Sequence, residues 1–417
     1  MTQTQSDSTA ATTAVPDVTV LREQMVAELI ESGVLTDPRI EAAFRAVPRE
    51  VFAPEGTSAQ LPYTIHDIVR TRFAADGSTV SSLSAPYMQA GNLAQACVEP
   101  GQRVLEIGSG GPLAAMLAHL VGPDGQVVTV DIDADVTART QAGLEQLGLT
   151  DRVEVVTADA ADRLGRGMFD RIIVAVAAWT IPEVWLEQLR PDGVIVVPLQ
   201  IAPGSQRILG FRRDGEKLVA ESVVLGGFVP MQGTHQHPRP RAVLTGPSGG
   251  DVAFEFADAV PDQFAVSDDV LASEPVEAWS EVTYRNGQVW VDILTWIGTR
   301  PGGCSITAES KSDIGRERSF YPCLTDGTSY AAIAMRPRPD DDDHVQVGAV
   351  GKGPNARQLT VRFVGEVTVY DQRHRRFDPK YTWWPSNLTP PEAGPTRTVI
   401  HRPHGTLVID WLDIDTY

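Results

Sequence analysis

The sequence has few of the residues that hold small secreted domains or metal centres together. Only three cysteines occur in 417 residues, and Cys97, Cys304 and Cys323 lie far apart. This number and spacing exclude a disulfide framework and a cysteine zinc knuckle, and they fit a reducing, cytoplasmic setting. No stretch reaches the ~20 apolar residues that a membrane-spanning helix needs. The first residues also lack a basic segment followed by an apolar one, so we expect no signal peptide.

Basic side chains are also scarce. The sequence has 35 lysines and arginines against 54 acidic residues, which gives a formal net charge of -19. Such a chain repels phosphate backbones, so nucleic acid is not an expected partner. His235 and His237 lie in a proline-rich segment without a third ligand nearby, and we expect a solvated loop there. The acidic run 340–343 is expected in a loop and lacks the spacing of a calcium site, so we expect no bound metal.

The composition nevertheless supports folded domains. An apolar content of 42% is too high for a disordered chain, and 417 residues correspond to two or three domains of ordinary size. Residues 1–17 are rich in Ser, Thr and Ala, and we expect them to form a disordered tail. Apolar residues at helical spacing predict one helix from residue 18 to residue 33 and another over residues 38–46.

Short apolar strands alternate with helices in the centre of the chain, which predicts an α/β fold with a parallel sheet covered on both faces. The expected strands are 103–108, 126–131, 153–158, 169–176 and 193–199. Residues 234–250 are rich in Pro and Gly and predict a linker. Residues 251–417 contain β-rich runs, among them 289–296 and 359–370, and predict a β-rich α+β domain.

The most informative local sequence is L-E-I-G-S-G-G over residues 105–111, where a strand ends in a glycine turn and a helix follows. Asp131 ends the next strand, and a carboxylate there suits the ribose hydroxyls of a bound adenosine. Asp159 follows the third strand, at a position suited to the adenine amine. A dinucleotide fits less well, because the third glycine of G-x-G-x-x-G is missing. The order favours S-adenosyl-L-methionine, and an unliganded glycine turn is the alternative.

Several motifs, in one order, resemble the protein L-isoaspartyl O-methyltransferase family. They are V-P-R-E at 47–50, S-A-P-Y-M at 84–88, the glycine loop at 104–110, Q-L-R-P-D-G at 188–193 and F-V-P-M at 228–231. The resemblance covers about residues 18–233. It implies a Rossmann-like, S-adenosyl-L-methionine-dependent methyltransferase domain with additional N-terminal helices, and S-adenosyl-L-homocysteine as the product.

The sequence also departs from the family pattern. Residues 108–112 read G-S-G-G-P where the family usually has G-T-G-S-G-Y, and Asp131 stands where a Glu is usual. The chain continues for about 180 residues beyond the resemblance, long enough for another domain. These features resemble a subgroup linked to lanthipeptide, lasso-peptide and graspetide clusters. The resemblance implies methylation of an L-aspartyl side chain in a ribosomally made precursor peptide, followed by closure of the ester to an aspartimide and its hydrolysis to isoaspartate.

The site residues follow from the same resemblance. Ser84 is expected to hold the substrate carboxylate or its neighbouring amide through a hydrogen bond, assisted by Ser81 and Ser82. The expected peptide contacts are Ala85, Pro86 and Tyr87. The expected cofactor contacts are Glu106, Gly108, Ser109, Gly110, Asp131, Ile132, Ala158, Asp159 and Ala160. Because an aspartyl carboxylate is ionised at neutral pH, its methylation needs orientation and exclusion of water more than a general base.

Two other functions remain open. The first is general repair of isoaspartyl proteins, and the second is a catalytically inactive methyltransferase fold that binds a peptide. The β-rich domain is expected to serve peptide recognition or self-association. The basic run 373–376 (R-H-R-R) is interpreted as a solvated strand end or as a dock for an acidic precursor peptide. Trp383, Trp384 and Trp411 are expected in the core.

Overall fold

The computed structural model describes residues 17–75, 77–285, 291–309, 321–338 and 341–413. Apart from Asp17, the tail expected at 1–17 lies outside the described residues. The chain divides into two compact units, Met1–Ala158 and Asp159–Tyr417, which are described separately below. Among the helices of the described part, none combines the length and the apolar character that crossing a membrane requires.

The first unit begins with the two expected helices, α1 (Val18–Glu31) and α2 (Pro38–Ala46), which are confirmed. Each begins at an aspartate whose side chain accepts a backbone N–H of the first turn: Asp17 accepts from Thr19, and Asp37 from Arg39. The apolar residues at helical spacing are the ones that α1 buries, namely Leu21, Met25, Val26 and Leu29.

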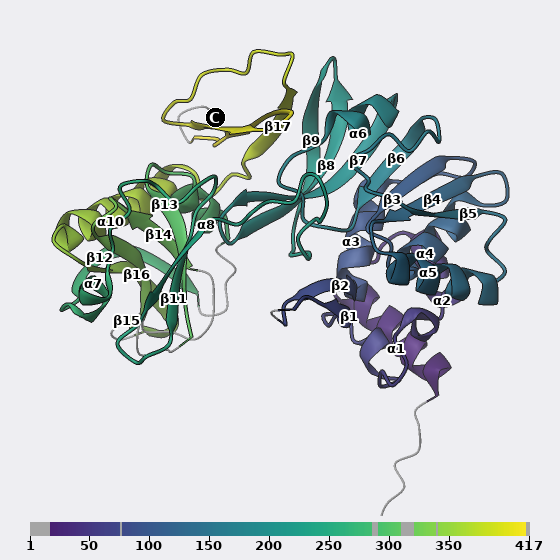
Figure 1. Ribbon diagram of the computed structural model, residues 1–417, viewed down its shortest axis with the longest axis horizontal. Helices are drawn as coiled ribbons and strands as arrows, with labels where there is room; N and C mark the ends of the chain where they lie inside the picture. Colours follow the sequence, from purple (N-terminus) through teal and green to yellow (C-terminus); the bar gives the residue numbers. More distant parts are fainter. Residues whose placement is uncertain (1–16, 76, 286–290, 310–320, 339–340, 414–417) are drawn as a thin grey trace, which may run out of the picture. The chain divides into compact units, whose positions relative to one another are not determined.

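Three parallel strands form the centre of the first unit, in the order β3 (Arg103–Ile107), β4 (Gln126–Asp131) and β5 (Val153–Thr157). Helix α4 (Pro112–Val121) connects β3 to β4, and α5 (Ala134–Gln146) connects β4 to β5 (Figure 1). This strand–helix alternation confirms the Rossmann-like α/β expectation for this part of the chain. In such a fold, ligands bind at the carboxyl ends of the strands.

Between the N-terminal helices and β3 the chain forms a short hairpin. Two 3-10 turns, Arg49–Phe52 and Leu61–Tyr63, lead into β1 (Val69–Phe73), which pairs antiparallel with β2 (Thr79–Leu83). Helix α3 (Pro86–Ala96) follows, with a proline in its first turn. The serines of the expected substrate segment therefore lie on β2 and on the link to α3.

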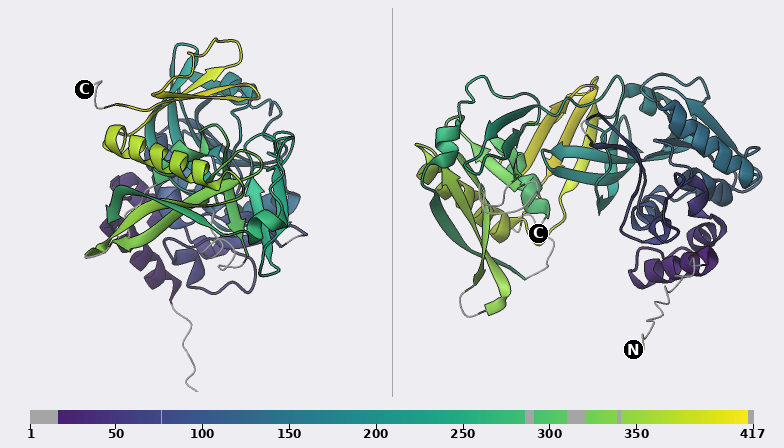
Figure 2. Two further views of the ribbon diagram at one scale, coloured as in Figure 1. Left: turned by 90° about the vertical axis from the view of Figure 1, so that its left-hand side faces the viewer. Right: turned by 60° about the horizontal axis from the view of Figure 1, so that its bottom comes forward.

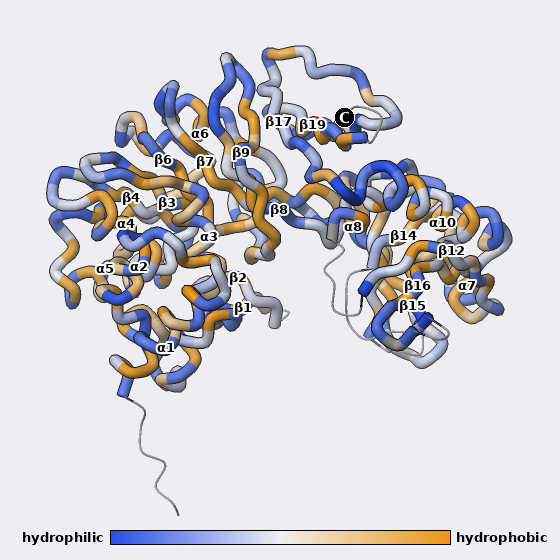
Figure 3. Tube along the Cα trace, turned by 180° about the vertical axis from the view of Figure 1, so that it is seen from behind, coloured by the Kyte–Doolittle hydropathy of each residue, from blue (hydrophilic) through white to orange (hydrophobic). Residues whose placement is uncertain are grey.

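The second unit starts with the remaining strands of the central block. Strand β6 (Phe169–Val174) pairs parallel with β7 (Leu189–Ala202), and α6 (Glu183–Gln188) lies between them in the sequence. Strand β8 (Ser205–Asp214) returns antiparallel to β7, and β9 (Lys217–Leu225) antiparallel to β8. Most residues of β7 are buried, and its trace shows long hydrophobic stretches (Figure 3).

The last three strands of the chain join this same sheet. Strand β17 (Lys380–Pro385) pairs with β9, and β19 (Gly405–Asp410) pairs with both β17 and β18 (Arg397–Arg402). The order within this unit is therefore β18-β19-β17-β9-β8-β7-β6, and the yellow strands lie beside the teal ones in Figure 2. Trp383 and Trp411 are buried, as expected, and Trp384 is partly buried. Strand β17 follows residue 251 in the sequence and pairs with β9, which precedes it. The domain boundary expected at residue 251 therefore stays a prediction.

A second sheet of the same unit has seven strands, in the order β10-β11-β13-β14-β15-β16-β12. Its strands are Arg241–Thr245, Asp251–Glu255, Val276–Arg285, Gly303–Ala308, Tyr321–Thr325, Tyr330–Arg338 and Asp341–Lys352, numbered β10 to β16. Three helices accompany them: α7 (Asp268–Ala272), α8 (Val291–Gly298) and α10 (Ala356–Arg373). This architecture confirms the β-rich α+β expectation.

Several local expectations in this region were wrong. The run 359–370 is helical, because its buried residues Leu359, Phe363, Val367 and Tyr370 recur at helical spacing, although its many valines favoured a strand. The run 289–296 falls on helix α8 where it is described. A short run of apolar and β-branched residues does not distinguish the two structures when its period is read over so few residues.

Two expected loops contain strands. The linker at 234–250 includes β10, a short edge strand that pairs with β11 on one side and accommodates proline and glycine just outside it. The acidic residues Asp341 and Asp343 begin β16, while residue 340 lies outside the described residues. Pairing with β15 outweighs the low strand propensity of aspartate there.

Candidate functional site

The glycine loop between β3 and α4 lies at the carboxyl end of the parallel strands. Gly108 has φ +92 and donates its backbone N–H to the carbonyl of Val130, at 2.9 Å. Gly111 has φ +93 and precedes Pro112, the first residue of α4. Positive φ at these positions favours glycine, which explains the glycine spacing of the motif. The loop therefore lies, with Gly108 and Gly110 partly buried, at the edge where ligands bind in this fold.

An aromatic ring fixes the part of the loop that departs from the family pattern. A Cβ atom on Gly111 would lie 2.1 Å from the ring of Phe52, and one on Gly143 of α5 would lie 2.4 Å from it. Phe52 is fully buried between these two glycines. Gly111 is therefore needed both for its backbone angle and for the space that the ring occupies.

Glu106 lies under this loop and is fully buried. Its Oε2 accepts a hydrogen bond from the hydroxyl of Thr129 at 2.5 Å, while its Oε1 has no hydrogen-bond partner among the described residues. Burial raises the pKa of Glu106 to about 8, although the Thr129 hydrogen bond opposes the rise. An orphaned carboxylate oxygen beside a glycine turn fits a ligand that brings a positive charge or a donor.

Asp131 ends β4 and faces the same loop. Burial raises its pKa to about 6, opposed by backbone N–H groups of Ser109 and Ile132. Its Oδ1 also accepts the backbone N–H of Asp133 at 2.9 Å. The carbonyl of Asp131 accepts the N–H of Ala158, at 3.0 Å. The first unit therefore brings together the expected cofactor residues up to Ala158. The carboxylate of Asp131 beside the glycine loop fits the ribose hydroxyls of the expected adenosine.

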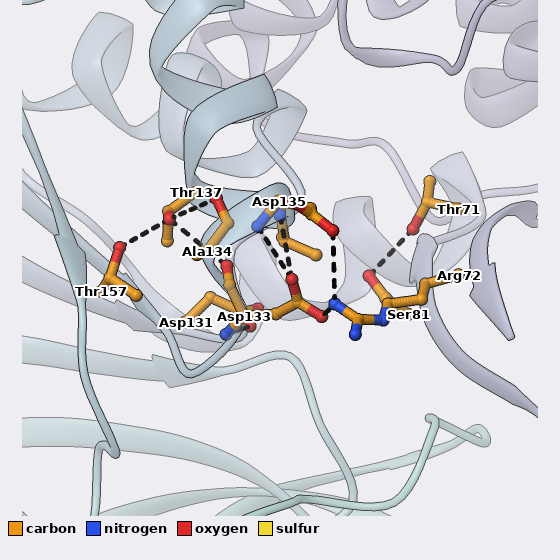
Figure 4. A network of polar contacts seen from close by, with 10 residues as sticks. Thr71, Arg72, Ser81, Asp131, Asp133, Ala134, Asp135, Thr137 and Thr157 are labelled. Atoms are coloured by element: carbon orange, nitrogen blue, oxygen red, sulfur yellow. Dashed lines mark hydrogen bonds and ion pairs between the residues drawn. The ribbon is translucent and has the colours of Figure 1, made fainter. Parts of the chain in front are cut away.

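A polar network that sequence reasoning missed ties the hairpin to this edge (Figure 4). Arg72 of β1 forms an ion pair with Asp133, whose Oδ1 in turn accepts the backbone N–H of Asp135 at 2.9 Å. On the neighbouring residue of β1, the hydroxyl of Thr71 donates to Ser81 Oγ at 2.9 Å. The strand that carries two of the candidate serines is thus tied to the loop that follows Asp131.

The end of β2 lies against the glycine loop. A Cβ atom on Gly110 would lie 3.7 Å from the carbonyl oxygen of Ser82 and 3.7 Å from Cδ2 of Leu83. Ser84 follows directly and is partly buried. The structure therefore brings the expected substrate segment and the expected cofactor loop together. Ser81 differs from Ser84, because its hydroxyl is engaged by Thr71.

A buried arginine holds the backbone at Ser84. Arg49 donates to the carbonyl of Ser84 at 2.7 Å, to the carbonyl of Pro62 at 2.6 Å and to the side chain of Gln89 on α3. Burial lowers the pKa of Arg49 to about 10. The family resemblance pointed to the segment of Arg49 but gave it no role. A lone arginine in a short turn carries no pattern from which burial can be predicted.

The remaining cofactor candidates, Asp159 and Ala160, begin the second unit. The carboxylate of Asp159 accepts backbone N–H groups of Ala161 at 2.9 Å and Thr234 at 2.7 Å, which lower its pKa against the effect of burial. The carbonyl of Ala160 accepts the indole N–H of Trp185 at 2.8 Å. The adenine role of Asp159 stays a prediction, and its carboxylate has a structural role that the sequence did not reveal.

The histidines of the supposed linker are not simply solvated. His237 stacks on Trp179 with ring centroids 3.6 Å apart, and the guanidinium of Arg402 lies 3.4 Å from the centroid of the Trp179 ring. Burial lowers the pKa of His237. His235 packs against His404 with ring centroids 4.6 Å apart. No group of three metal-ligating side chains occurs in the described part of the chain.

The basic run 373–376 also has structural partners. Arg373 pairs with Asp413 at 3.0 Å, and Arg375 with Asp371 at 2.7 Å. The ring of His374 is buried, and its Nδ1 lies 2.9 Å from the carbonyl oxygen of Leu412. This run ends helix α10, so the expected strand end was wrong. Basic residues are favoured there by the negative end of the helix dipole.

Comparisons with known proteins match about the first half of the chain. The family model described as protein-L-isoaspartate(D-aspartate) O-methyltransferase matches residues 20–236. The protein-L-isoaspartate O-methyltransferase of Ignicoccus hospitalis is 31% identical over 211 residues, which are 50% of this chain and 96% of that protein. The enzyme of the same name from Brucella anthropi is 34% identical over 226 residues, which are 52% and 95%. A solved protein-L-isoaspartate O-methyltransferase is 18% identical, with a TM-score of 0.47, covering 93% of this chain and 98% of that one.

Proposed function

The chain belongs to the protein-L-isoaspartate(D-aspartate) O-methyltransferase family, and from this we propose that it methylates the free carboxylate of isoaspartyl residues in polypeptides. As a family member it is a protein carboxyl O-methyltransferase whose methyl donor is S-adenosyl-L-methionine. The observation that carries the proposal is the close approach of Ser82 and Leu83, which directly precede Ser84, to Gly110. In this proposal, the segment that continues to Ser84 binds the substrate carboxylate beside the loop that holds the cofactor.

The chain's own residues supply binding and orientation. S-adenosyl-L-methionine, when bound, supplies a methyl group on a sulfonium. Glu106, the 108–111 loop and Asp131 are the residues of the first unit that would hold it, with Asp131 suited to the ribose hydroxyls. Ser84 donates a hydrogen bond to the substrate carboxylate, and Arg49 fixes the backbone from which Ser84 projects.

The reaction needs no proton transfer. A carboxylate with an ordinary pKa is ionised at neutral pH, so one of its oxygens attacks the methyl carbon directly. The bound cofactor would supply the methyl group by exchange of its S–CH₃ bond for the new O–CH₃ bond, with the electron pair left on sulfur as a neutral thioether. Rate enhancement therefore comes from aligning oxygen, carbon and sulfur while water is excluded.

A direct assay tests the proposal. The full chain is incubated with S-adenosyl-L-methionine carrying a labelled methyl group and with a six-residue peptide in its isoaspartyl and aspartyl forms. We expect a base-labile methyl ester on the isoaspartyl form alone. Absence of methylation together with absence of cofactor binding by calorimetry would instead support the inactive, peptide-binding alternative.

A second candidate is methylation of an ordinary L-aspartyl residue in a ribosomally made precursor peptide. The observation that favours it is the seven-stranded sheet, which lies beyond the family match at residues 20–236. A methyl ester there would be attacked by the following backbone nitrogen, with loss of methanol and formation of an aspartimide. Mass spectrometry of a precursor peptide encoded beside this gene would show a transient gain of one methyl group and then a net loss of one water.

A further inference from the structure

We propose that Arg70 is a substrate-binding residue, whose guanidinium holds the substrate carboxylate together with the hydroxyl of Ser84. The inference deepens the proposed function and rests on it in taking the substrate to carry a free carboxylate. Arg70 lies between the family-like motifs at 47–50 and 84–88 and belongs to neither. The residues that carry the inference all belong to the first unit.

The register of the β1–β2 hairpin places Arg70 beside the candidate serines. Arg70 lies directly opposite Ser82, and Val69 lies opposite Leu83. Residues that face each other in an antiparallel pair project their side chains from the same face. Val69 and Leu83 are buried, whereas Arg70 is exposed and Ser82 is partly buried. Arg70 and Ser82 therefore share the face of the hairpin that the core does not cover.

Ser84 belongs to this face as well. Burial alternates along the end of β2, because Leu83 and Ala85 are 0% and 3% exposed while Ser82 and Ser84 are only partly buried. This alternation is that of an extended chain. Ser84 is thus the diagonal neighbour of Arg70, about 7–8 Å away, which a long side chain spans. A carboxylate bound to the Ser84 hydroxyl lies within reach of the guanidinium.

The donors on this face are not used within the protein. The side chains of Arg70, Ser82 and Ser84 form no hydrogen bond or ion pair in the described part of the chain. On the other face, by contrast, the hydroxyl of Ser81 is engaged by Thr71 at 2.9 Å. A guanidinium presents paired N–H donors that match the two oxygens of a carboxylate. Free donors thus gather where the substrate carboxylate is expected.

Nearby carboxylates leave the charge of Arg70 available. Arg72, the other arginine of β1, forms an ion pair with Asp133, and its Nη1 lies 3.7 Å from Oδ2 of Asp135 (Figure 4). Asp67, three residues before Arg70, is exposed and forms no ion pair with it in the described chain. Of the two arginines of β1, Arg70 is therefore the one whose charge is left for a ligand.

The charge balance of the chain gives such a residue a purpose. The net charge is -19, and the neighbouring cofactor loop itself includes the carboxylates of Glu106 and Asp131 close by. A substrate carboxylate entering this surrounding is repelled unless a local positive charge offsets the repulsion. The carboxylate loses its charge on methylation, so Arg70 binds the substrate at least as strongly as the transition state. Its loss should therefore raise KM more than it lowers kcat.

Kinetics with the six-residue isoaspartyl peptide test the role of Arg70 in the full chain. Arg70→Ala should raise KM about tenfold and change kcat less than about twofold. Arg70→Lys should restore part of the loss, because an ammonium keeps the charge without the planar fork. Arg241→Ala is the matched control: Arg241 is an exposed arginine on strand β10, and its loss changes the net charge equally. It should leave KM unchanged.

A binding comparison separates recognition of the carboxylate from a structural effect. The second peptide has the free carboxylate of the isoaspartyl residue replaced by an amide, and calorimetry is carried out with S-adenosyl-L-homocysteine present. The unaltered chain should bind the carboxylate peptide about tenfold more tightly than the amide peptide. Most of this difference should disappear in Arg70→Ala. The melting temperature and the dissociation constant for S-adenosyl-L-methionine should stay the same.

Three outcomes would overturn the inference: an unchanged KM in Arg70→Ala, equal weakening of the carboxylate and amide peptides, or the same rise in KM with Arg241→Ala. The last would assign the effect to net charge alone. If the unaltered chain does not methylate the isoaspartyl peptide, the proposed function fails, while the binding comparison still decides on Arg70. The two failures are therefore distinguishable.

Discussion

At the scale of single residues, Glu106 shows how burial gives a motif residue its properties. The family pattern marked it as a cofactor residue, but only the structure shows that one of its oxygens is bonded to Thr129 and that the other has no partner in the described chain. Serine at 81, 82 and 84 looked alike in the sequence. Their hydrogen bonds separate them, because Ser81 is engaged by Thr71 of the facing strand.

Replacement of Glu106 by Gln should make stability less dependent on pH. The folded pKa of about 8 lies above the ordinary value of 4.5, so the protein prefers the protonated carboxyl. The stability that this preference gives is fully present below pH 4.5 and falls as pH rises toward 8, by up to about 1.4 kcal/mol per pH unit.

The amide of Glu106→Gln does not ionise. Its advantage in free energy of unfolding over the unaltered protein should therefore grow between pH 5 and pH 8, as measured by urea denaturation. The exposed Glu55→Gln is the control. A difference that stays constant with pH would contradict the raised pKa.

The serines can be separated by kinetics. Ser84→Ala should lower kcat/KM for the isoaspartyl peptide about 10- to 100-fold, because a hydrogen bond to a charged carboxylate is lost in orienting it. Ser81→Ala should have little effect, since its hydroxyl bonds to Thr71. The dissociation constant for S-adenosyl-L-methionine should stay the same in both variants. Full activity of Ser84→Ala would remove Ser84 from the site.

At the scale of elements, the sequence predicted the parallel strands and their helices well. A short strand that is apolar throughout must be buried on both faces, and a parallel sheet covered by helices provides that burial. The bounds expected for α2 and β4 match those observed. Helices α8 and α10 were mistaken for strands, since valine and isoleucine favour strands locally while packing against a sheet decides the outcome. The link from Arg72 to Asp133 joins two elements that no sequence pattern connects.

The turn between β3 and α4 offers a matched pair of glycines. Gly111→Ala should lower the free energy of unfolding by about 1–3 kcal/mol or more, because the new Cβ would overlap the Phe52 ring at a position with positive φ. Gly110→Ala meets only ordinary contacts, the nearest at 3.7 Å, and should fold normally.

The methyl group of Gly110→Ala would nevertheless stand between the loop and β2, where the proposed function puts the methyl donor and the substrate carboxylate. We expect weaker binding of S-adenosyl-L-methionine by calorimetry with a near-normal melting temperature. Equal stability of the two variants would show that the Phe52 ring moves aside at low cost.

At the scale of the whole molecule, the two properties to consider are the net charge and the pairing of strands that lie far apart in the sequence. The net charge of -19 follows directly from the composition, but no sequence pattern showed that strands from residue 380 onward return to the sheet of β7–β9. Pairings between strands far apart in sequence carry no local pattern. A cavity beside β9 was unpredictable for the same reason, since its lining residues range from Arg207 to Lys380 in the sequence.

The acidic balance predicts a dependence on salt. An isoaspartyl peptide with several further acidic residues is repelled by the enzyme's field at low ionic strength. Raising sodium chloride from 20 to 200 mM shortens the screening length, so the KM of that peptide should fall several-fold. The KM of a lysine-rich peptide should rise over the same range. The same trend for both peptides would indicate a salt effect on the protein itself.

Strand β17 completes the sheet only after about 150 further residues have followed β9. During synthesis on the ribosome, β9 therefore emerges long before β17. Until β17 is made, the edge of β9 that faces away from β8 lacks this strand partner. Closing so long a loop is slow and raises the contact order of the domain. We expect refolding to show a late phase in which Trp383 becomes buried, and nascent chains that stall before residue 380 should need chaperones to avoid edge-to-edge aggregation.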